Sequence, residues 1–177
     1  MLEIVIGPMY SGKTSYLIDK VRLFEEKKEK YLIINHFLDT RYNIDNITNH
    51  NKISVKCTSL KNISDILNIP NYEEYKHILI DEAQFFTDLE SGVSNLIYNN
   101  PDIDVICVGL DGDYQQNYFN DAQLLKLIPK SNNLIKLYSK CYICGQKASF
   151  TKRIINDETQ IIIASKGVYV PCCFKHI

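Results

Sequence analysis

Short runs of branched apolar residues alternate along the chain with segments whose apolar positions recur at helical spacing. Uninterrupted apolar runs are typical of strands buried on both faces of a parallel sheet, and helices usually cover such sheets. We predict strands at 2–6, 31–34, 53–57, 77–81, 104–110 and 134–138. We predict helices at 13–30, 60–67, 89–99 and 121–128. The asparagine-rich stretch 39–52 has no periodic pattern and is predicted to be a long loop. The order of elements therefore predicts an α/β fold around a mainly parallel sheet.

The texture of the sequence changes after Tyr138. Cysteines, lysines and short alternating runs at 148–154 and 159–163 replace the continuous apolar runs. Such alternation is typical of half-buried strands in a small β-rich unit. We therefore predict two domains, an α/β domain over 1–138 and a β-rich domain over 139–177.

Composition narrows the classes of function. Of the 177 residues, 45% are hydrophobic and 23% are charged, which is ordinary for a globular protein with one sizeable core. The formal net charge is −1, so the chain lacks the basic excess with which proteins hold DNA or RNA. Membrane-spanning helices need ~20 apolar residues, and no run approaches that length. The first residues also lack the basic lead of a signal peptide. We expect a cytoplasmic protein with neither a membrane nor a nucleic-acid polymer as partner.

The segment after the first predicted strand carries a phosphate-binding motif. Its sequence, which fits G-x-x-x-x-G-K-S/T, is Gly7-Pro8-Met9-Tyr10-Ser11-Gly12-Lys13-Thr14. Glycines let backbone N–H groups curl around phosphate oxygens, and the N-terminus of the next helix adds its dipole. Lys13 is expected to reach the β- and γ-phosphates of ATP, and Thr14 to offer its hydroxyl to Mg²⁺. A glycine turn that binds nothing is the weaker interpretation, because the motif stands between a predicted strand and helix.

Two acids stand where the predicted strand 77–81 ends. Asp81 is expected to hold Mg²⁺ through water, and Glu82 to act as the general base that takes a proton from an attacking hydroxyl. The alternative is an acidic turn that caps the next helix. Phe85 and Phe86 follow closely, and they can either wall a flat base or belong to the core.

The six cysteines divide into two groups. Cys57 and Cys107 lie in apolar runs and are expected to be buried thiols. The others form pairs suited to a closed, tetrahedral structural Zn²⁺ site. The predicted ligands are Cys141, Cys144, Cys173 and His176. Cys172 could be the zinc ligand in place of Cys173. The alternative to a metal site is that the four thiols are not linked.

Taken together, these motifs resemble the type II thymidine kinase family, which has cellular, bacterial and poxviral members. The resemblance runs through nearly the whole chain, and the acid-Gln-Phe-Phe segment joined to C-terminal cysteines is its specific part. The length is similar to that of the poxviral members. The matching segments are Ile6–Thr14, Asp39-Thr40-Arg41-Tyr42, Ile80–Phe86, Gly109–Gly112 with Phe119, Cys141–Cys144, Ala148–Arg153 and Tyr169 ahead of Cys173.

The resemblance implies a RecA-like nucleotide-binding core and a small zinc-stapled domain whose lasso loop covers the nucleoside. It implies ATP-dependent phosphorylation of thymidine at the 5′-hydroxyl with Mg²⁺, by a homotetramer that the triphosphate end product inhibits. If the family's residue roles are carried onto the matching positions, Glu82 is the general base, Lys13 binds ATP, and Arg41 contacts phosphate. The positions that match the thymine pocket are Met9, Phe85, Leu110, Tyr114, Phe119, Thr151 and Tyr169.

Four positions depart from the family's pattern. Ile163-Ala164-Ser165 stands where the lasso usually carries Ile-Gly-Gly, Ala83 replaces a commoner Gly, and His176 takes a place that many members give to Cys. The sequence therefore leaves thymidine, deoxyuridine and deoxycytidine unranked as acceptors. A nucleotide-binding regulatory ATPase and a zinc-ribbon nucleic-acid module are the rival classes. The absence of an N-K-x-D motif argues against a GTPase switch, and the neutral charge argues against the nucleic-acid module.

Overall fold

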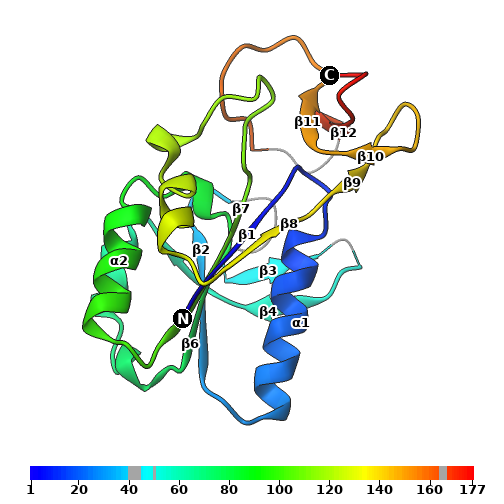
Figure 1. Cartoon of the computed structure of the whole chain (residues 1–177). Coiled ribbons are helices and arrows are strands. Elements are labelled where there is room, and N and C mark those ends of the chain that lie inside the picture. The colour runs from blue at the N-terminus through cyan, green and yellow to red at the C-terminus, as the bar shows by residue number, and fades with distance from the viewer. Residues whose placement is uncertain (40–44, 50, 164–166) are drawn as a thin grey trace.

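The centre of the molecule is a parallel sheet of six strands in the order β5-β2-β6-β7-β1-β8 (Figure 1). The computed structural model describes residues 1–39, 45–49, 51–163 and 167–177. The predicted α/β class is confirmed, and every neighbouring pair in this sheet is parallel. Its strands are β1 (Leu2–Ile6), β2 (Tyr31–His36), β5 (Thr58–Leu60), β6 (His77–Ile80), β7 (Asp104–Gly109) and β8 (Asn133–Lys136).

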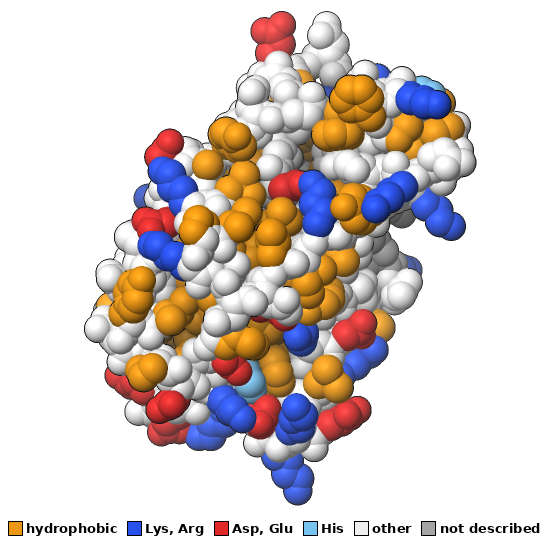
Figure 2. Space-filling model, in the orientation of Figure 1, with side chains coloured by type: hydrophobic (Ala, Val, Ile, Leu, Met, Phe, Trp, Pro, Cys, Tyr) orange, Lys and Arg blue, Asp and Glu red, His pale blue; other side chains and the backbone are white. Residues whose placement is uncertain are grey.

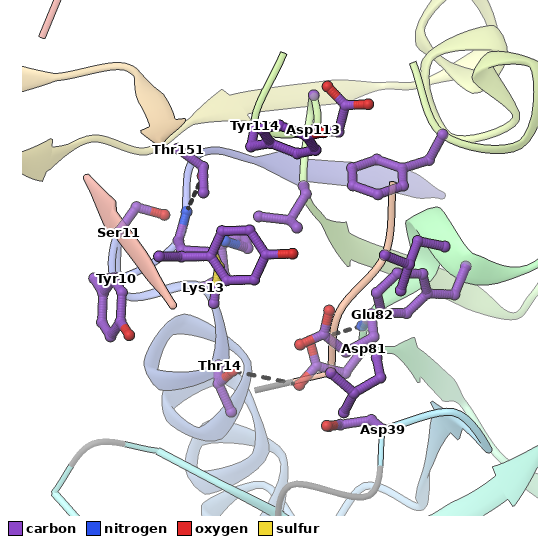
Figure 3. Close-up of a pocket in the computed structure, with 18 of the residues that line it drawn as sticks. Tyr10, Ser11, Lys13, Thr14, Asp39, Asp81, Glu82, Asp113, Tyr114 and Thr151 are labelled. Carbon is purple, nitrogen blue, oxygen red and sulfur yellow. Dashed lines mark hydrogen bonds between the residues drawn. The ribbon is translucent and has the colours of Figure 1, made fainter. Parts of the chain in front are cut away.

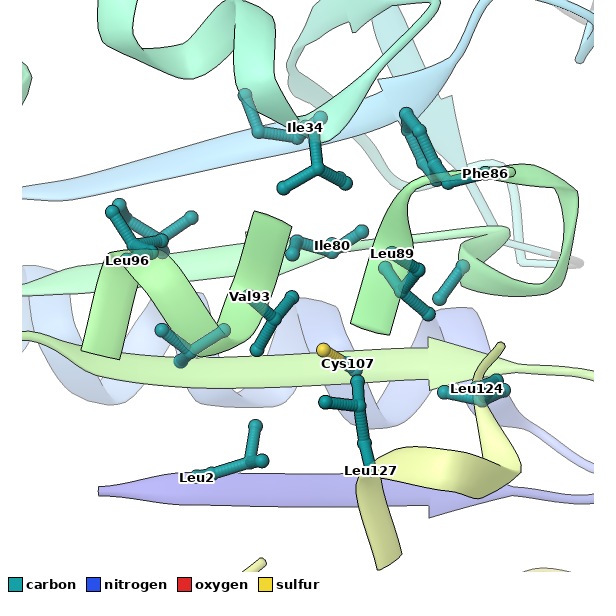
Figure 4. Packing of buried hydrophobic residues seen from close by; sticks show 14 of the residues in the cluster. Leu2, Ile34, Ile80, Phe86, Leu89, Val93, Leu96, Cys107, Leu124 and Leu127 are labelled. Carbon is teal, nitrogen blue, oxygen red and sulfur yellow. The ribbon is translucent and has the colours of Figure 1, made fainter. Parts of the chain in front are cut away.

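Two α-helices cover opposite faces of the sheet (Figure 1). Because successive strand residues point to opposite faces, Ile4 and Ile6 pack in the cluster under α2 (Leu89–Asn99), whereas Val5 packs under α1 (Lys13–Glu26). Figure 4 shows the α2 side, where side chains of the helix meet those of β1, β2, β6 and β7. Apolar side chains therefore pack on both faces of the sheet, as the mainly apolar strands predict.

Helix α1 ends earlier than the predicted boundary at Lys30. The backbone of Lys28 adopts a left-handed conformation with φ 58°, and Glu29 N donates to the Phe24 carbonyl at 2.9 Å. This closing pattern, with a left-handed residue just after the helix, turns the chain back toward β2. The last charged residues of the predicted helix thus belong to the turn.

Two predicted helices are 3₁₀ helices in the structure. The segment predicted at 60–67 overlaps η1 (Ile63–Asn68), and the one predicted at 121–128 overlaps the end of η4 (Asn120–Ala122) and the first part of η5 (Leu125–Lys130). Short 3₁₀ turns replace longer α-helices here, and Pro129 lacks the N–H that a continued helix needs. The other 3₁₀ helices are η2 (Tyr72–Glu74) and η3 (Ala83–Phe85).

The predicted long loop at 39–52 contains a strand. β3 (Asn46–Thr48) pairs with β4 (Ser54–Lys56) in an antiparallel hairpin, and Ile47 is buried on the α1 side of the sheet. The strand predicted at 53–57 is also divided, because β4 joins this hairpin while β5 joins the main sheet. The prediction of a structureless stretch is therefore wrong for 46–48.

The C-terminal part of the chain forms two small antiparallel sheets beyond the carboxyl ends of the central strands (Figure 1). Their strands are β9 (Ser139–Lys140), β10 (Lys147–Ala148), β11 (Phe150–Arg153) and β12 (Tyr169–Cys172). The alternating run at 148–154 is largely extended as predicted, but 159–163 forms no strand. No helix in the described ranges is both long and apolar enough to cross a bilayer.

The two isolated cysteines differ in burial. Cys107 is fully buried in the cluster under α2, as predicted, whereas Cys57 is only half-buried, so that part of the prediction is wrong. Desolvation raises the pKa of each thiol to about 12. Both side chains are therefore protonated and unreactive near neutral pH.

A charged cluster lies at the amino end of the sheet, where Figure 2 shows basic and acidic side chains gathered at the lower end of the molecule. The Glu29 carboxylate accepts from Lys76 Nζ, and its Oε2 lies 2.9 Å from His77 Nε2. The hydrogen bonds with Lys76 and His77 lower the pKa of Glu29 to about 2. The His77 ring also stacks on Phe24 at a centroid distance of 3.7 Å.

This cluster predicts a specific acid dependence. Because the folded-state pKa of Glu29 lies below its usual 4.5, its stabilisation is present above about pH 4.5 and is lost as the pH falls toward 2. We expect Glu29→Gln to lower Tm at pH 6, and the Tm difference from wild type to shrink progressively below pH 4.5. Thermal unfolding between pH 2 and 7 measures this. Glu26→Gln, which removes an exposed carboxylate at the end of α1, is the control, and a Glu29→Gln difference that is constant with pH would contradict the prediction.

Candidate functional site

A cavity of about 1150 Å³, including its open mouth, lies at the carboxyl edge of the parallel sheet (Figure 3). Loops at strand ends, the β3 hairpin and the C-terminal segment all contribute to its walls. Such edges are where open α/β sheets bind ligands. The sequence-predicted site residues that line it are Met9, Tyr10, Ser11, Gly12, Lys13, Thr14, Asp81, Glu82, Phe85, Leu110, Tyr114, Phe119, Thr151 and Tyr169.

The phosphate-binding motif forms the turn between β1 and α1. Gly12 has φ 87°, which favours glycine, and α1 begins at the next residue. A Cβ on Gly7 would lie 2.6 Å from the Leu137 carbonyl oxygen, so only glycine fits there. Lys13 Nζ donates to the carbonyls of Gly7 and Pro8 at 3.1 and 2.7 Å, which holds the ammonium over the loop. Gly7 and Pro8 are not among the lining residues.

The first acid of the predicted pair lies beside the start of α1. Thr14 Oγ1 donates to Asp81 Oδ2 at 3.4 Å, and the other carboxylate oxygen accepts from the Glu82 N–H at 2.9 Å (Figure 3). Asp81 is only 4% exposed. The hydroxyl and the carboxylate thus place oxygen atoms together at a helix N-terminus, and oxygen is the ligand type that Mg²⁺ prefers.

The second acid is held by a side chain that the sequence analysis did not single out. Glu82 has φ 49°, and its Oε2 accepts from Gln84 Nε2 at 2.6 Å. Gln84 is buried, and its Oε1 accepts from the Leu110 N–H at 2.9 Å. Gln84 therefore links the candidate base to the end of β7. A glutamine two residues after an acid gives no local pattern from which this bridge can be predicted.

The two phenylalanines after the acids have different surroundings. Phe86 is fully buried in the cluster under α2, so the core interpretation holds for it. Phe85 lines the cavity and meets Phe119 edge-to-face at a centroid distance of 5.8 Å. Behind them lies the buried His36, whose pKa is lowered by desolvation. Its Nδ1 accepts from Leu38 N at 3.3 Å, which fits a neutral ring.

The C-terminal part of the chain contacts the phosphate-binding motif directly. Thr151 Oγ1 accepts from the Met9 N–H at 2.9 Å, and Ser139 Oγ donates to the Tyr10 carbonyl at 3.0 Å. Thr151 is therefore bonded to the loop itself, in addition to lining the cavity. The two contacts fix the loop that ends β1 against the small β11–β12 sheet and the strand β9.

Several lining residues were given no individual role in the sequence analysis, although Ile163 belongs to the stretch that matches the lasso. Asp39 belongs to a segment that matches the family but received no role, and Asp113 follows β7. The other two groups are Ile47–Asn49 from the β3 hairpin and Gln160–Ile163 from the C-terminal segment. Their residue types are common in surface loops, so only the tertiary fold brings them to the cavity. Arg41 and Ala164-Ser165 lie outside the residues that the structure describes.

The predicted zinc ligands converge on one point. The ligand atoms of Cys141, Cys144, Cys173 and His176 all lie within 4.8 Å of one another. Tetrahedral Zn–S and Zn–N bonds would place two sulfurs roughly 3.8 Å apart and a sulfur and a nitrogen roughly 3.6 Å apart. The sulfurs of Cys144 and Cys173 are 3.7 Å apart, and His176 Nδ1 lies 3.5 Å from Cys141 Sγ and 3.3 Å from Cys173 Sγ.

These three separations are close to those of a tetrahedral zinc site. Of the two neighbouring cysteines, Cys173 belongs to the cluster and Cys172 does not. Cys172 is fully buried instead. The cluster therefore forms a four-ligand set that could bind Zn²⁺ and join β9–β10 to the chain end.

The fold and the cavity place this chain among the α/β proteins that bind a ligand at the carboxyl edge of a parallel sheet. The family model described as thymidine kinase matches residues 1–177. A thymidine kinase of Amsacta moorei entomopoxvirus is 37% identical over 176 residues, covering 97% of this chain and 94% of the relative. One from Pseudothermotoga lettingae is 32% identical over 174 residues, covering 97% and 91%. One from Oryza sativa subsp. japonica is 32% identical over 179 residues, and the chain spans 65% of that relative's length. The chain belongs to the thymidine kinase family.

Proposed function

We propose that the protein transfers the γ-phosphate of ATP to the 5′-hydroxyl of thymidine, as an enzyme of nucleotide salvage. The observation that carries this proposal is the composition of one cavity. Its lining joins the Lys13-Thr14 end of a phosphate-binding motif, the Asp81-Glu82 pair, and an aromatic wall that includes Phe85. A phosphate donor and a flat acceptor can thus meet at a carboxylate, which is the arrangement that phosphoryl transfer to a nucleoside requires.

The motif and the first acid would bind ATP. The backbone of residues 7–14 and the N-terminus of α1 offer N–H groups to the phosphates, and Lys13 would leave its carbonyl partners to reach the β- and γ-phosphates. Thr14 and Asp81 would hold Mg²⁺, which neutralises charge on the phosphates when bound. Arg41 would contact phosphate.

The aromatic and apolar lining would bind the base. Phe85 and Phe119 would lie against the thymine ring, with Met9, Leu110 and Tyr169 closing the pocket around it. The other lining residues in this group are Tyr114 and Thr151. A base seated there would direct its sugar toward Glu82, which lines the same cavity (Figure 3).

Glu82 would act as the general base. Its carboxylate takes the proton of the 5′-hydroxyl while that oxygen forms a bond to the γ-phosphorus, and the bond to the β,γ-bridging oxygen breaks to release ADP. Lys13 stabilises the charge on the transferred group. The hydrogen bond from Gln84 keeps the carboxylate oriented toward the cavity.

The four-ligand cluster would hold a structural Zn²⁺, which pins the C-terminus and organises residues 139–177 as a small domain on the α/β domain of residues 1–138. We further propose a cytoplasmic homotetramer. The net charge of −1 supports a small-molecule acceptor rather than a nucleic-acid polymer.

A parallel assay with thymidine, deoxyuridine, deoxycytidine and deoxyguanosine, each with ATP and Mg²⁺, tests the proposed acceptor. We expect kcat/KM for thymidine to exceed that for deoxycytidine and deoxyguanosine by at least about 10²-fold. A preference for another deoxynucleoside would support the proposed kinase activity but show that thymidine is not the acceptor. ATP hydrolysis that no nucleoside stimulates would instead support a regulatory ATPase and contradict the proposal.

Replacing Lys13 by methionine tests the phosphate half of the site. We expect kcat/KM for ATP to fall by about 10²- to 10³-fold, because a preorganised cation that faces the transferred phosphate is lost. Lys27→Met, which removes an exposed ammonium just beyond α1, is the matched control and should leave the value within twofold. Steady-state kinetics with varied ATP measure both variants, and a Lys13→Met value close to wild type would refute the assignment.

A further inference from the structure

The side chain of Arg153, at the end of β11, is almost completely buried, with 1% of its surface exposed. Its Nη1 donates to the carbonyl of Asp157 at 2.7 Å and to that of Thr159 at 2.5 Å. Its Nη2 donates to the Gln160 carbonyl at 3.2 Å and to the Tyr169 hydroxyl at 2.5 Å. One guanidinium therefore holds three backbone carbonyls of the segment that follows it.

Two tyrosines complete this cluster. The guanidinium lies 3.8 Å from the ring centroid of Tyr114 and 5.1 Å from that of Tyr169. The Tyr169 hydroxyl accepts from the Ile162 N–H at 3.2 Å, and the Tyr114 hydroxyl donates to the Glu158 carbonyl at 3.2 Å. Each aromatic ring thus contacts the cation on one side and binds the same backbone segment through its hydroxyl.

The segment at 157–163 has little other support. Within the described part of the chain it belongs to no helix or strand, and its residues form no backbone–backbone hydrogen bond. Gln160 Nε2 donates to Asp113 Oδ2 at 2.9 Å and to the Tyr118 carbonyl at 3.0 Å. Yet Gln160 and the following isoleucines, Ile161 to Ile163, form one wall of the cavity. The shape of that wall therefore depends on Arg153 and its tyrosine partners.

The burial of this cation is costly if stability is its only purpose. Desolvating a guanidinium costs several kcal/mol, and apolar replacements of buried ions are often neutral or stabilising. The nearest carboxylate, on Asp157, lies 3.8 Å away and is 40% exposed, so it compensates only part of the charge. The planar fork of donors suits a different purpose, since only arginine can bind several carbonyls in one fixed geometry.

We propose that Arg153 is a positioning residue that holds the 157–163 segment in the shape that receives the nucleoside. The inference rests on the proposed function for the identity of the ligand. Because the Arg153 guanidinium bonds the carbonyls of Asp157, Thr159 and Gln160, which shape the wall of the base pocket, it governs nucleoside affinity rather than ATP binding or phosphoryl transfer. Loss of the fork leaves three carbonyls unsatisfied and frees the wall to move.

The test compares Arg153→Lys, Arg153→Met and the control Arg22→Met, which removes an exposed arginine of α1. Steady-state kinetics with varied thymidine and varied ATP give both KM values and kcat for the full-length enzyme. We expect both Arg153 variants to raise the thymidine KM about 10- to 100-fold, with kcat and the ATP KM within about threefold of wild type. Lysine keeps the charge but not the fork, so it should resemble methionine.

A second readout does not depend on activity. Thermolysin cleaves before isoleucine, and we expect cleavage at Ile161–Ile163 to be at least tenfold faster in the Arg153 variants than in wild type or Arg22→Met. Unchanged thymidine KM together with unchanged cleavage would overturn the proposal, as would equal increases in both KM values, which indicate general destabilisation. If Arg153→Met fails to fold, the thymidine KM and the cleavage rate of Arg153→Lys test the proposal. If the wild type does not phosphorylate thymidine, the proposed function fails, and the cleavage rates still test the role of Arg153.

Discussion

Replacing Glu82 by glutamine is expected to lower kcat for thymidine phosphorylation by about 10²- to 10⁴-fold. Glutamine matches the shape of the side chain but cannot accept the proton of the attacking hydroxyl. Glutamine also suits the left-handed backbone at this position, where φ is 49°, better than a β-branched residue would. ATP affinity should stay within about threefold of wild type, since Lys13, Thr14 and Asp81 remain in place.

Steady-state kinetics with saturating thymidine measure the fall in kcat, and equilibrium binding of a fluorescent ATP analogue measures the retained affinity. Glu73→Gln is the matched control, because it makes the same chemical change at an exposed carboxylate outside the cavity. Turnover of Glu82→Gln within threefold of wild type would show that another group removes the proton. A parallel loss of ATP binding would show that the substitution disturbs the site as a whole.

Replacing Cys144 by alanine is expected to remove the bound metal and to destabilise the C-terminal part of the chain. Structural zinc sites in small domains contribute about 10–16 kcal/mol of apparent binding free energy, so losing one of four ligands should lower the free energy of unfolding by more than about 4 kcal/mol. Residues 139–177 carry Thr151 and Tyr169 of the cavity, and the thymidine KM should therefore rise at the same time.

The neighbouring cysteine supplies a control within the same unit. Cys172 lies outside the four-ligand cluster, so Cys172→Ala should keep one zinc ion per chain and lose only about 1 kcal/mol of packing. Elemental analysis after gel filtration measures the zinc content, and thermal unfolding measures the stability. Retention of a full zinc equivalent by Cys144→Ala, or its loss from Cys172→Ala, would contradict the proposed ligand set.

Most of the sheet follows from local sequence pattern. Runs such as Leu2–Ile6 and Asp104–Gly109 are apolar apart from Glu3 and Asp104, and a strand covered on both faces buries the apolar side chains on both sides of such a run. The helix at Leu89–Asn99 is predicted at its observed bounds because its apolar positions recur with one period. By contrast, Asn46–Thr48 offers one apolar residue, and its pairing with Ser54–Lys56 is set by tertiary contacts.

Site residues were predictable where their chemistry has a fixed spacing. The phosphate-binding motif and the cysteine pairs have such spacings, and their residues lie together in the fold. Phe85 and Phe86 show the limit of this reasoning, because adjacent aromatic residues face the cavity and the core respectively. Arg153 was not singled out either. A lone arginine at a strand end is usually exposed, and nothing nearby in sequence shows that carbonyls will surround it.

The isoleucines at 161–163 show how a buried side chain can override a local pattern. A run of three β-branched residues is typical of a strand, but the carbonyls just before them bind Arg153 instead of a neighbouring strand. The segment is therefore irregular, and its apolar side chains face the cavity.

The most direct test of the central claim is to follow the γ-phosphate itself. The purified protein is incubated with ATP labelled at the γ-phosphate, Mg²⁺ and thymidine, and the labelled products are separated and counted against the ADP formed. Phosphoryl transfer predicts labelled thymidine monophosphate in a one-to-one ratio with ADP, and almost no ADP when thymidine is omitted. Labelled inorganic phosphate as the main product, formed at the same rate with and without thymidine, would contradict it.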